Sequence, residues 1–524
     1  MSLARDHANA AQLTASNPAV SAFVAASAGS GKTKLLTDRL LRLMLGGAPP
    51  ERIQCLTFTK AAAAEMALRL QRRLGEWVTL EDAALDRALR ALDVAPSPES
   101  RARARALFAQ VLDLPGGMRV GTIHAFCQSL LRRFPLEAAL SPHFQMADER
   151  DAHDALANAR EDMLANASSE IARSALARLA GLTTTARFAR LVAALQSDRE
   201  RLARAFALGP GLAAAQMRAL GLTASTAAEV IEGAISWPAE PELQRAVEHV
   251  AGHGAPKCRE KSARLLDWLG LAAAERREHW AAWRAEFITP LGEGRKAGAF
   301  LNAKLAEARP GLGDVFVAEV ERVLAMDDAC RGAEMAAISA ALATLAAPVL
   351  DGYARRKTEA GLLDYEDLIG RTQSLLVDPG AAWVLYKLDG GLDHLLLDEV
   401  QDTAPAQWRI AHALTAEFFA GQGARGGSGF VTRTVFAVGD RKQSIFSFQG
   451  ADAAEFDRSR ALLGARVRAA GEVWEETPLD VSFRSTAPVL ALVDAVFAHP
   501  LAAAGMAEPG TVRHETDRVG QAGV

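Results

Sequence analysis

One short stretch near the start of the chain constrains its fold more than any other. Residues 23–36 read FVAASAGSGKTKLL, an apolar run followed by small residues and then by a second apolar run. Within it, residues 26–33 (ASAGSGKT) have the spacing of a Walker A loop, with alanine in the first glycine position. Small residues let successive backbone N–H groups approach phosphate oxygens, and the N-terminus of a following helix favours negative charge. The stretch therefore predicts a phosphate-binding loop between a strand and a helix, the alternative being a plain glycine-rich turn.

The residue types in this loop indicate ATP and Mg²⁺ as the cofactors. Lys32 is expected to reach the β- and γ-phosphates, and the Thr33 hydroxyl is expected to be a ligand of the magnesium ion. The residues expected to line the nucleotide are Ala26, Ser27, Ala28, Gly29, Ser30, Gly31, Lys32 and Thr33.

A Walker A loop needs an acidic partner at the same magnesium ion, and residues 395–403 (LLLDEVQDT) supply the best candidate. Asp398, at the end of an apolar run, is expected to hold the metal through water. Glu399 is expected to orient and deprotonate the attacking water. Alone, an Asp-Glu pair in this position is a weak signal, because acids are common at strand ends. Together with the loop it predicts one ATP·Mg²⁺ site.

The separation of the two motifs predicts the domain organisation. Lys32 and Asp398 must meet at one nucleotide, although more than 360 residues lie between them. Strand-like and helix-like runs alternate near both motifs, as in a parallel α/β sheet, whereas the middle of the chain is rich in Ala, Leu and Arg with helical periodicity. We therefore expect a mostly α-helical insertion, interrupted by exposed, partly basic loops. Those loops are residues 253–261 and 289–298; the expected strands are 20–26, 52–59, 393–400 and 433–440, and the helices near the first two strands are 32–45 and 60–74.

The bulk properties exclude several classes of protein. A chain of 524 residues is too long for a single hydrophobic core. The net charge of −4 gives no global nucleic-acid footprint, so any DNA groove must be local. The four cysteines lie far apart with no CxxC pair, which argues against a zinc site and a disulfide framework. Without an apolar N-terminal region or an uncharged apolar run of about 20 residues, we expect a soluble, cytoplasmic protein with no membrane partner.

Six segments are similar, in sequence and in order, to motifs of superfamily-one DNA helicases of the UvrD/Rep type. The resemblance is greatest to the AddA group, RecB-like helicase–nuclease proteins that process double-strand breaks. The segments are LTFTKAAAAEM (56–66), GTIHAFCQSLLRRFP (121–135), GLLDYEDLI (361–369), LLLDEVQDT (395–403), VFAVGDRKQSIFSFQGAD (435–452) and LDVSFRST (479–486).

This resemblance implies a RecA-like P-loop domain and an ATP-dependent DNA helicase for double-strand break repair by homologous recombination. It also implies 3′-to-5′ movement, single-stranded DNA in the motor groove, a double-strand end as substrate and an AddB-type partner in a heterodimer. The implied domains are 1–146, first part of the motor (Q motif, Walker A, Ia and Ic); 147–350, the helical insertion; 351–480, second part of the motor (Walker B and motif III); and 481–524, the truncated start of a second motor domain.

By the same resemblance, four residues outside the two Walker motifs belong to the nucleotide site. Gln12, about twenty residues before Lys32, corresponds to a glutamine that reads adenine; a solvated helix glutamine is the alternative. Phe483 matches an aromatic that stacks on adenine, or else is a core residue. Arg484 matches an arginine that reaches the γ-phosphate, or else is a surface ion-pair partner. Gln443 matches a glutamine that senses the γ-phosphate and relays its loss to the DNA groove.

The resemblance also implies a set of DNA contacts. Threonine and backbone N–H groups grip phosphate without reading sequence, and aromatic side chains stack on any base. For the aromatic residues and the histidine, a place in the core is the alternative. A basic loop around Arg295 and Lys296 could touch duplex DNA or be a solvated charge cluster. The implied strand-binding residues are Phe58, Thr59, Lys60, Thr122 and His124, with Phe446 and Phe448 as stacking platforms.

The end of the chain and two rival readings complete the expectations. Only 40 residues follow Arg484, too few for a second RecA-like domain, which is expected to be absent or only begun. The chain is thus expected to bind ATP·Mg²⁺ but hydrolyse it slowly, with unwinding and nuclease activity belonging to longer family proteins. The rivals are a P-loop kinase or other NTPase, and a nucleotide- and DNA-binding scaffold or inactive fragment without unwinding activity.

Overall fold

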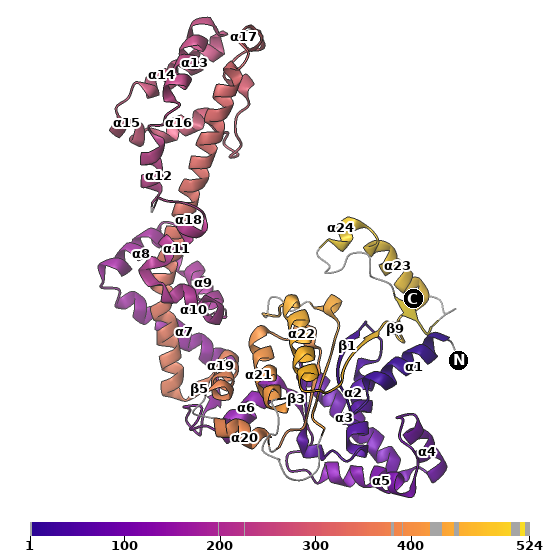
Figure 1. Ribbon diagram of the computed structural model, residues 1–524. Coiled ribbons are helices and arrows are strands. Elements are labelled where there is room, and N and C mark those ends of the chain that lie inside the picture. Colours follow the sequence, from indigo (N-terminus) through magenta and orange to yellow (C-terminus); the bar gives the residue numbers. More distant parts are fainter. Residues whose placement is uncertain are drawn as a thin grey trace. The chain divides into compact units, whose positions relative to one another are not determined.

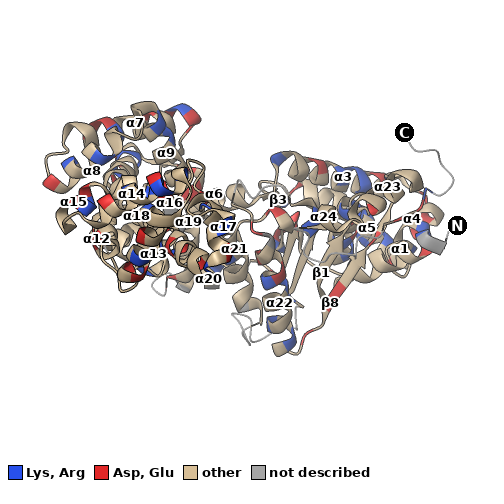
Figure 2. Cartoon of the chain, turned by 90° about the horizontal axis from the view of Figure 1, so that it is seen from above, with Lys and Arg blue, Asp and Glu red and all other residues tan. Residues whose placement is uncertain are grey.

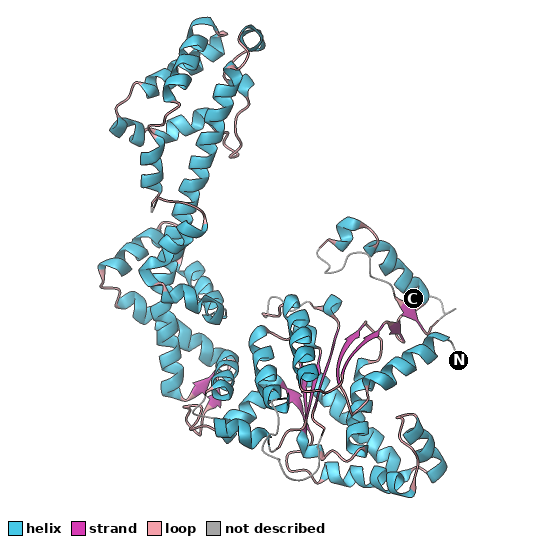
Figure 3. Ribbon diagram, in the orientation of Figure 1, coloured by secondary structure: helices cyan, strands magenta, loops and turns pink. Residues whose placement is uncertain are grey.

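The computed structural model describes residues 3–197, 199–224, 226–378, 382–389, 391–419, 432–444, 450–504 and 514–518. The chain forms two compact units, residues 1–146 with 361–524 and residues 147–360. Among the described residues, strands occur only in the first unit, and the second is built of helices (Figure 3). The predicted fold class, an α/β parallel sheet domain with a large helical insertion, is confirmed.

One six-stranded parallel sheet, in the order β3-β2-β6-β7-β1-β8, forms the centre of the first unit (Figure 1). Strand β7 separates β1 from β6, with Ala25 paired with Gly439 and Asp398 paired with Val438. Because the strands are parallel, all their carboxyl ends meet at one edge, where α/β proteins bind ligands. The strands are β1 (Ser21–Ala26), β2 (Ile53–Thr57), β3 (Arg119–Thr122), β6 (His394–Asp398), β7 (Thr434–Gly439) and β8 (Trp474–Leu479).

Alternation along the strands creates two cores, one on each face of the sheet. On β1, Ala22 and Val24 point into one core and Phe23 into the other. The first core is covered by α1 (Leu3–Ala15), α2 (Lys32–Leu45), α3 (Lys60–Thr79), α4 (Asp82–Arg90) and α5 (Pro98–Leu112). The second lies under α6 (Ile123–Arg133), α19 (Tyr365–Val377), α20 (Ala382–Asp389), α21 (Pro405–Ala416) and α22 (Ala453–Ala469).

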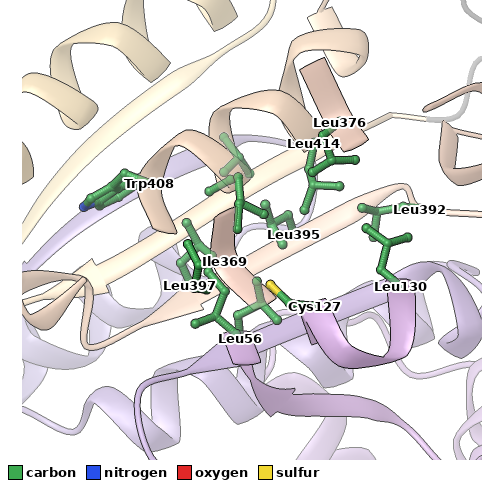
Figure 4. Close-up of a cluster of buried hydrophobic side chains, with 14 of the residues drawn as sticks. Leu56, Cys127, Leu130, Ile369, Leu376, Leu392, Leu395, Leu397, Trp408 and Leu414 are labelled. Carbon is green, nitrogen blue, oxygen red and sulfur yellow. The ribbon is translucent and has the colours of Figure 1, made fainter. Parts of the chain in front are cut away.

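Figure 4 draws part of the second core. Leu56 of β2 and Leu395 and Leu397 of β6 project from the sheet toward the covering helices. Helix side chains that meet them include Cys127 and Leu130 of α6, Ile369 of α19, and Trp408 and Leu414 of α21. Burial on both faces explains why these strands read as continuous apolar runs rather than as alternating ones.

Short strands mark the two ends of the insertion. Strand β4 (Gln145–Met146) pairs in parallel with β5 (Leu362–Leu363), so the chain segments that lead out of and back into the first unit lie side by side. A second small pair joins β9 (Val481–Ser482) to β10 (Glu515–Thr516). Helices α23 (Ala487–Phe497) and α24 (Pro500–Ala503) follow β9.

The helical unit is organised along α18 (Leu312–Ala360), a helix of 49 residues. Two hydrophobic clusters form on it, one with α7–α9 and one, rich in tryptophan and phenylalanine, with α13, α14 and α16. The other helices are α7 (Glu149–Ala165), α8 (Glu170–Ala180), α9 (Thr185–Ser197), α10 (Arg199–Ala207), α11 (Leu212–Ala219), α12 (Ala227–Ala234), α13 (Glu240–His253), α14 (Pro256–Leu269), α15 (Ala273–Glu278), α16 (Trp280–Phe287) and α17 (Ala303–Ala308).

Two sequence-based expectations for this unit need correction. The helical unit continues past position 350, because α18 runs unbroken to Ala360 and ends at Gly361, whose φ is +65°. The expected loop at 253–261 is wrong, since α14 begins at Pro256 and only two residues separate it from α13. Proline is well suited to the first helical position, where no N–H is needed. Residues 289–296 are non-helical, as expected, and Arg295 donates to the Ala285 carbonyl.

The charges and the apolar stretch of α18 bear on what the surface can meet. Lys and Arg are interspersed with Asp and Glu along the helices of both units (Figure 2). By length and composition alone, α18 is the one helix of the described residues long and apolar enough to cross a membrane. A buried core helix passes the same test, and Leu345, Ala346 and Val349 in this helix are buried against its neighbours.

A buried arginine ties α2 to the segment that leads into β1. The Arg39 guanidinium has no exposed surface and donates to the carbonyls of Asn17 and Val20, each at 2.6 Å. It also donates to Thr434 Oγ1 at 3.1 Å and lies 4.9 Å from the centre of the Phe436 ring. Burial, and then the charge of Arg42, lower the pKa of Arg39 to about 9. No carboxylate of the described residues forms an ion pair with it.

We expect Arg39→Met to destabilise the first unit by about 2–4 kcal/mol, because buried carbonyls lose a charged donor while the desolvation cost of the charge is recovered. Hydrogen exchange of the β1 and α2 amides, followed by mass spectrometry, reports this unit alone. The control is Arg69→Met, which removes an exposed i,i+4 pair with Glu65 and is expected to cost about 0.5 kcal/mol or less. Equal exchange rates in the two variants would contradict the role given to Arg39.

Candidate nucleotide site and strand-binding edge

The phosphate-binding loop connects β1 directly to α2. Its two glycines have positive φ, +75° at Gly29 and +89° at Gly31. A Cβ atom on Gly29 would lie 2.7 Å from Arg484 Cβ, and one on Gly31 would lie 2.8 Å from Gln12 Nε2. Both glycines are therefore required by backbone conformation and by the close approach of neighbouring segments. The loop ends at Lys32, the first residue of α2, with Thr33 next to it.

The loop meets the acidic end of β6. Lys32 Nζ lies 2.6 Å from Glu399 Oε2. Glu399 has a φ of +50°, which is uncommon outside glycine, and its backbone N–H donates to Asp398 Oδ1 at 3.0 Å. The structure thus brings Lys32, Asp398 and Glu399 together at the carboxyl edge of the sheet.

Asp398 is a carboxyl group in an environment that lacks enough positive charge. Its residue is 9% exposed. Burial and the neighbouring Glu399 carboxylate raise the pKa of Asp398 to about 7, although the Lys32 ammonium acts in the opposite direction. A cation next to such a group would favour its ionised form. The donor set of Asp398 and Thr33 therefore fits a magnesium ion.

Gln12 is packed against the loop from the side of α1. Its side chain donates from Nε2 to the Ser30 carbonyl at 2.9 Å, and its Oε1 accepts from Lys34 Nζ at 2.9 Å. Gln12 is only 3% exposed, so the alternative of a solvated helix glutamine is wrong. Its predicted part in reading adenine stays a prediction.

The segment after β8 closes the other side of the loop. The backbone N–H of Phe483 donates to the Gly29 carbonyl at 2.9 Å, and Arg484 packs its Cβ atom against Gly29. Phe483 is half-buried and Arg484 is exposed. Of the other loop residues, Ser27 and Ser30 are buried and Ala28 is exposed.

A glutamine in the β6 turn links the acidic motif to the end of β7. Gln401 donates from Nε2 to Glu399 Oε2 at 2.7 Å, and its Oε1 accepts from the Asp440 backbone N–H at 2.9 Å. A Cβ on Gly439 would lie 2.6 Å from Gln401 Oε1, so only glycine fits at the end of β7. Gln443, in the short 3-10 helix η7 (Arg441–Gln443), donates to Asp440 Oδ2 at 2.7 Å.

The predicted strand-binding residues begin two helices at the same edge. Thr59 is the N-cap of α3, its Oγ1 accepting from the Ala62 N–H at 3.1 Å, and Lys60 is the exposed first residue of that helix. Thr122 caps α6 in the same way. Because β2 and β3 are paired in register, both helix N-termini point to one edge, where they favour phosphate.

The predicted aromatic contacts are placed unevenly. Phe58 is half-buried at the end of β2. The ring of His124 lies 5.1 Å from that of Tyr365, edge to face, and burial lowers the pKa of His124, which favours the neutral imidazole. Phe446 and Phe448 lie outside the described residues.

The nucleotide edge and the strand-binding edge share one wall. A small cavity at the carboxyl ends of β2 and β6 is lined on one side by Asp398 and on the other by Thr57 and Phe58, with Trp408 of α21 at its base. The two predicted functions therefore use neighbouring side chains of adjacent strands.

Comparison with known protein families agrees with this geometry. Residues 8–461 match the family model described as the UvrD/REP helicase N-terminal domain, which is most of the chain. The chain belongs to this helicase family. Membership implies an ATP-dependent enzyme and accounts for a Walker A loop, an acidic β6 and a helical insertion in one chain.

The curated relatives are longer proteins, named as AddA-type ATP-dependent helicase/nucleases. That of Desulforudis audaxviator is 28% identical over 529 residues, which cover 91% of this chain and 38% of that protein. The protein of the same name from Pelotomaculum thermopropionicum is also 28% identical, with 91% and 37% covered, and that from Enterococcus faecalis is 25% identical over the same shares. The chain thus spans less than two fifths of the length of these relatives.

Several residues that shape this helicase site were missed in the sequence. Lys34 binds Gln12, Gln401 joins Glu399 to Asp440, and Arg39 holds the entry to β1. For Gln401 a signal was available, since it lies two residues after Glu399 in the acidic motif. For Arg39 and Lys34 none was, because arginine and lysine on an amphipathic helix normally predict a solvated face.

We expect Gly29→Ala to lower the thermal midpoint of unfolding much more than Gly47→Ala. Both substitutions place a side chain at positive φ, but only at position 29 does the new Cβ meet fixed atoms; at Gly47 the nearest one is Arg103 Nη1 at 4.0 Å. The strain common to both is about 1–2 kcal/mol. Differential scanning fluorimetry of the two variants measures the excess at Gly29, and equal midpoints would contradict the close packing of the loop against Arg484.

Proposed function

We propose that this chain is the ATP-binding part of a DNA motor for double-strand break repair by homologous recombination, of the kind that its helicase/nuclease relatives represent. The observation that carries the proposal is the 2.6 Å contact between Lys32 of the phosphate-binding loop and Glu399 of the acidic strand end, with Asp398 beside it. A loop cation and a candidate base at one point fit hydrolysis of a polyphosphate.

The residues at this edge suit both cofactors. Positive-φ glycines leave the loop backbone open to phosphate oxygens, and α2 begins at Lys32 with its N-terminus toward the same place. Thr33 and Asp398 would hold Mg²⁺. When bound, Mg²⁺·ATP supplies the γ-phosphoryl group whose transfer to water releases the energy for movement.

Each nearby side chain then has a defined task. Lys32 neutralises phosphate charge, and Glu399 Oε2 accepts a proton from the attacking water. Gln401 holds that carboxylate at 2.7 Å, which fixes its direction. Arg484 adds positive charge against the loop, and Phe483 and Gln12 would hold the adenine. Gln443 reports the state of the terminal phosphate to the neighbouring edge.

The strand-binding edge gives the motor something to move along. Lys60, Thr59 and Thr122 would contact phosphates of a single strand, and Phe58 and His124 would contact its bases. The cavity wall shared by Asp398 and Phe58 supports coupling between the two sites. We further propose 3′-to-5′ movement toward a double-strand end, an AddB-type partner in a heterodimer, and a cytoplasmic location, as the resemblance implies.

Two substitutions separate nucleotide binding from turnover. Lys32→Ala should lower the affinity for a non-hydrolysable ATP analogue at least tenfold, because a charged phosphate contact is lost. Glu399→Gln should leave that affinity within a few-fold while reducing DNA-stimulated ATP hydrolysis by about 10²–10⁴-fold, the usual contribution of a general base. Calorimetric titration and a phosphate-release assay measure the two quantities.

The control for both is Lys304→Ala, an exposed lysine of α17 in the helical unit. ATP binding by the wild-type chain with no turnover in the presence of DNA would favour a nucleotide- and DNA-binding scaffold instead.

A second test addresses the strand-binding edge. Lys60→Ala should weaken binding of a single-stranded oligonucleotide and reduce the slope of log affinity against log salt concentration by about 0.7, the value for one phosphate contact. Fluorescence anisotropy at several salt concentrations gives this slope. Lys304→Ala should leave it unchanged, and equal effects of the two substitutions would argue against a specific edge.

A further inference from the structure

Lys442 lies against the phosphate-binding loop, although 415 residues separate it from its contact there. Its Nζ atom donates to Ser27 Oγ at 3.2 Å. Ser27 is buried near the start of the loop, and its backbone N–H is held by the Leu479 carbonyl at 2.9 Å. The tip of the lysine side chain therefore meets a fixed point of the loop.

The backbone of Lys442 is placed by the same contacts that place Gln443. Asp440 caps η7, with its Oδ1 accepting from the Lys442 N–H at 3.1 Å and its carbonyl accepting from the Gln443 N–H at 2.8 Å. Asp440 is in turn held by Gln401 at 2.9 Å, and Gln401 contacts Glu399. Lys442 thus projects from a turn that is tied to the acidic end of β6.

Strand order decides which part of a nucleotide this turn can face. The end of β7 lies between the loop after β1 and the acids after β6. The terminal phosphate must lie between Lys32 and Glu399, because Glu399 acts on the water that attacks it. A side chain that reaches from the end of β7 to Ser27 therefore approaches the terminal phosphate and not the adenine.

The charge on Lys442 is available for such a contact. Its neighbour Arg441 is ion-paired with Asp457 of α22, and Lys32 with Glu399. Within the described part of the chain, no carboxylate lies within ion-pair distance of Lys442, whose ammonium group has the Ser27 hydroxyl as its one hydrogen-bond partner there. Asp494 of α23 feels its charge at longer range: burial acts to raise the pKa of Asp494, but hydrogen bonds from His514 and then the Lys442 charge lower it.

We propose that Lys442 is a second cation of the nucleotide site, which contacts the terminal phosphate of a bound nucleoside triphosphate from the β7 side, opposite Lys32. The inference rests on the proposed function, since it takes ATP as the ligand. A phosphate oxygen is a stronger acceptor for an ammonium group than a serine hydroxyl, so the contact with Ser27 is readily exchanged for one with phosphate. Lys442 would then make the site prefer a triphosphate over a diphosphate.

The experiment compares two ligands in the full chain without DNA. Calorimetric titration gives the affinities for a non-hydrolysable ATP analogue and for ADP, each with Mg²⁺. Lys442→Ala should lower the affinity for the ATP analogue about tenfold or more and change that for ADP by no more than about twofold. Lys442→Arg should retain most of the preference for the ATP analogue.

Two further variants separate phosphate contact from a structural role. Lys442→Gln can still hydrogen-bond Ser27 but has no charge, so it should lose the preference as the alanine variant does. Arg441→Ala, which removes the neighbouring cation on the same turn, should keep it. Equal loss of both affinities in Lys442→Ala, or wild-type discrimination in Lys442→Gln, would overturn the inference.

The same titrations distinguish failure of this inference from failure of the proposed function. A wild-type chain that binds neither nucleotide would overturn both. A wild-type chain that binds the ATP analogue and ADP, with an unchanged ratio in Lys442→Ala, would overturn only the role of Lys442.

Discussion

The contact between Lys32 and Glu399 is the constraint on which the rest of the structure depends. It joins residues 367 positions apart, and it requires β1 and β6 to end at one edge with only β7 between them. Parallel strands satisfy this requirement because their carboxyl ends coincide. The chain between them must then leave and return without disturbing the sheet, and the paired β4 and β5 provide that passage. The helical unit is the consequence.

Around that contact, close packing does more than charge to define the site. The loop has no room for a Cβ at Gly29 or Gly31, because Arg484 and Gln12 lie against it. Gln12 is in turn held in place through α1, whose end is tied to α2 by Arg39 and Arg42. Segments from the start, middle and end of the first unit thus converge on eight residues, so a change in any one of them moves the others.

The same packing suggests how nucleotide state reaches the strand-binding edge. Glu399 is bonded to Gln401, which is bonded to Asp440, which caps the turn carrying Lys442 and Gln443. On the other side, Asp398 lines the cavity that Phe58 also lines. Under the proposed function, a terminal phosphate that alters the Lys32–Glu399 pair acts on both chains of contacts at once. These contacts link two discrete groups of side chains, as a two-state motor needs.

The sequence by itself determined the elements whose signals are local. Residues 32–45 form a helix with the predicted bounds, because a glycine N-cap and an apolar periodicity are written in consecutive residues. The acidic end of β6 and the need for an insertion followed from motif spacing and chemistry. Only the tertiary structure decided which side chains meet: that Gln12 is buried, that Pro256 begins a helix, that Arg39 is a core residue, and that Lys442 reaches Ser27. Such partners depend on strand order and on the packing of segments hundreds of residues apart, and no local pattern encodes those distances.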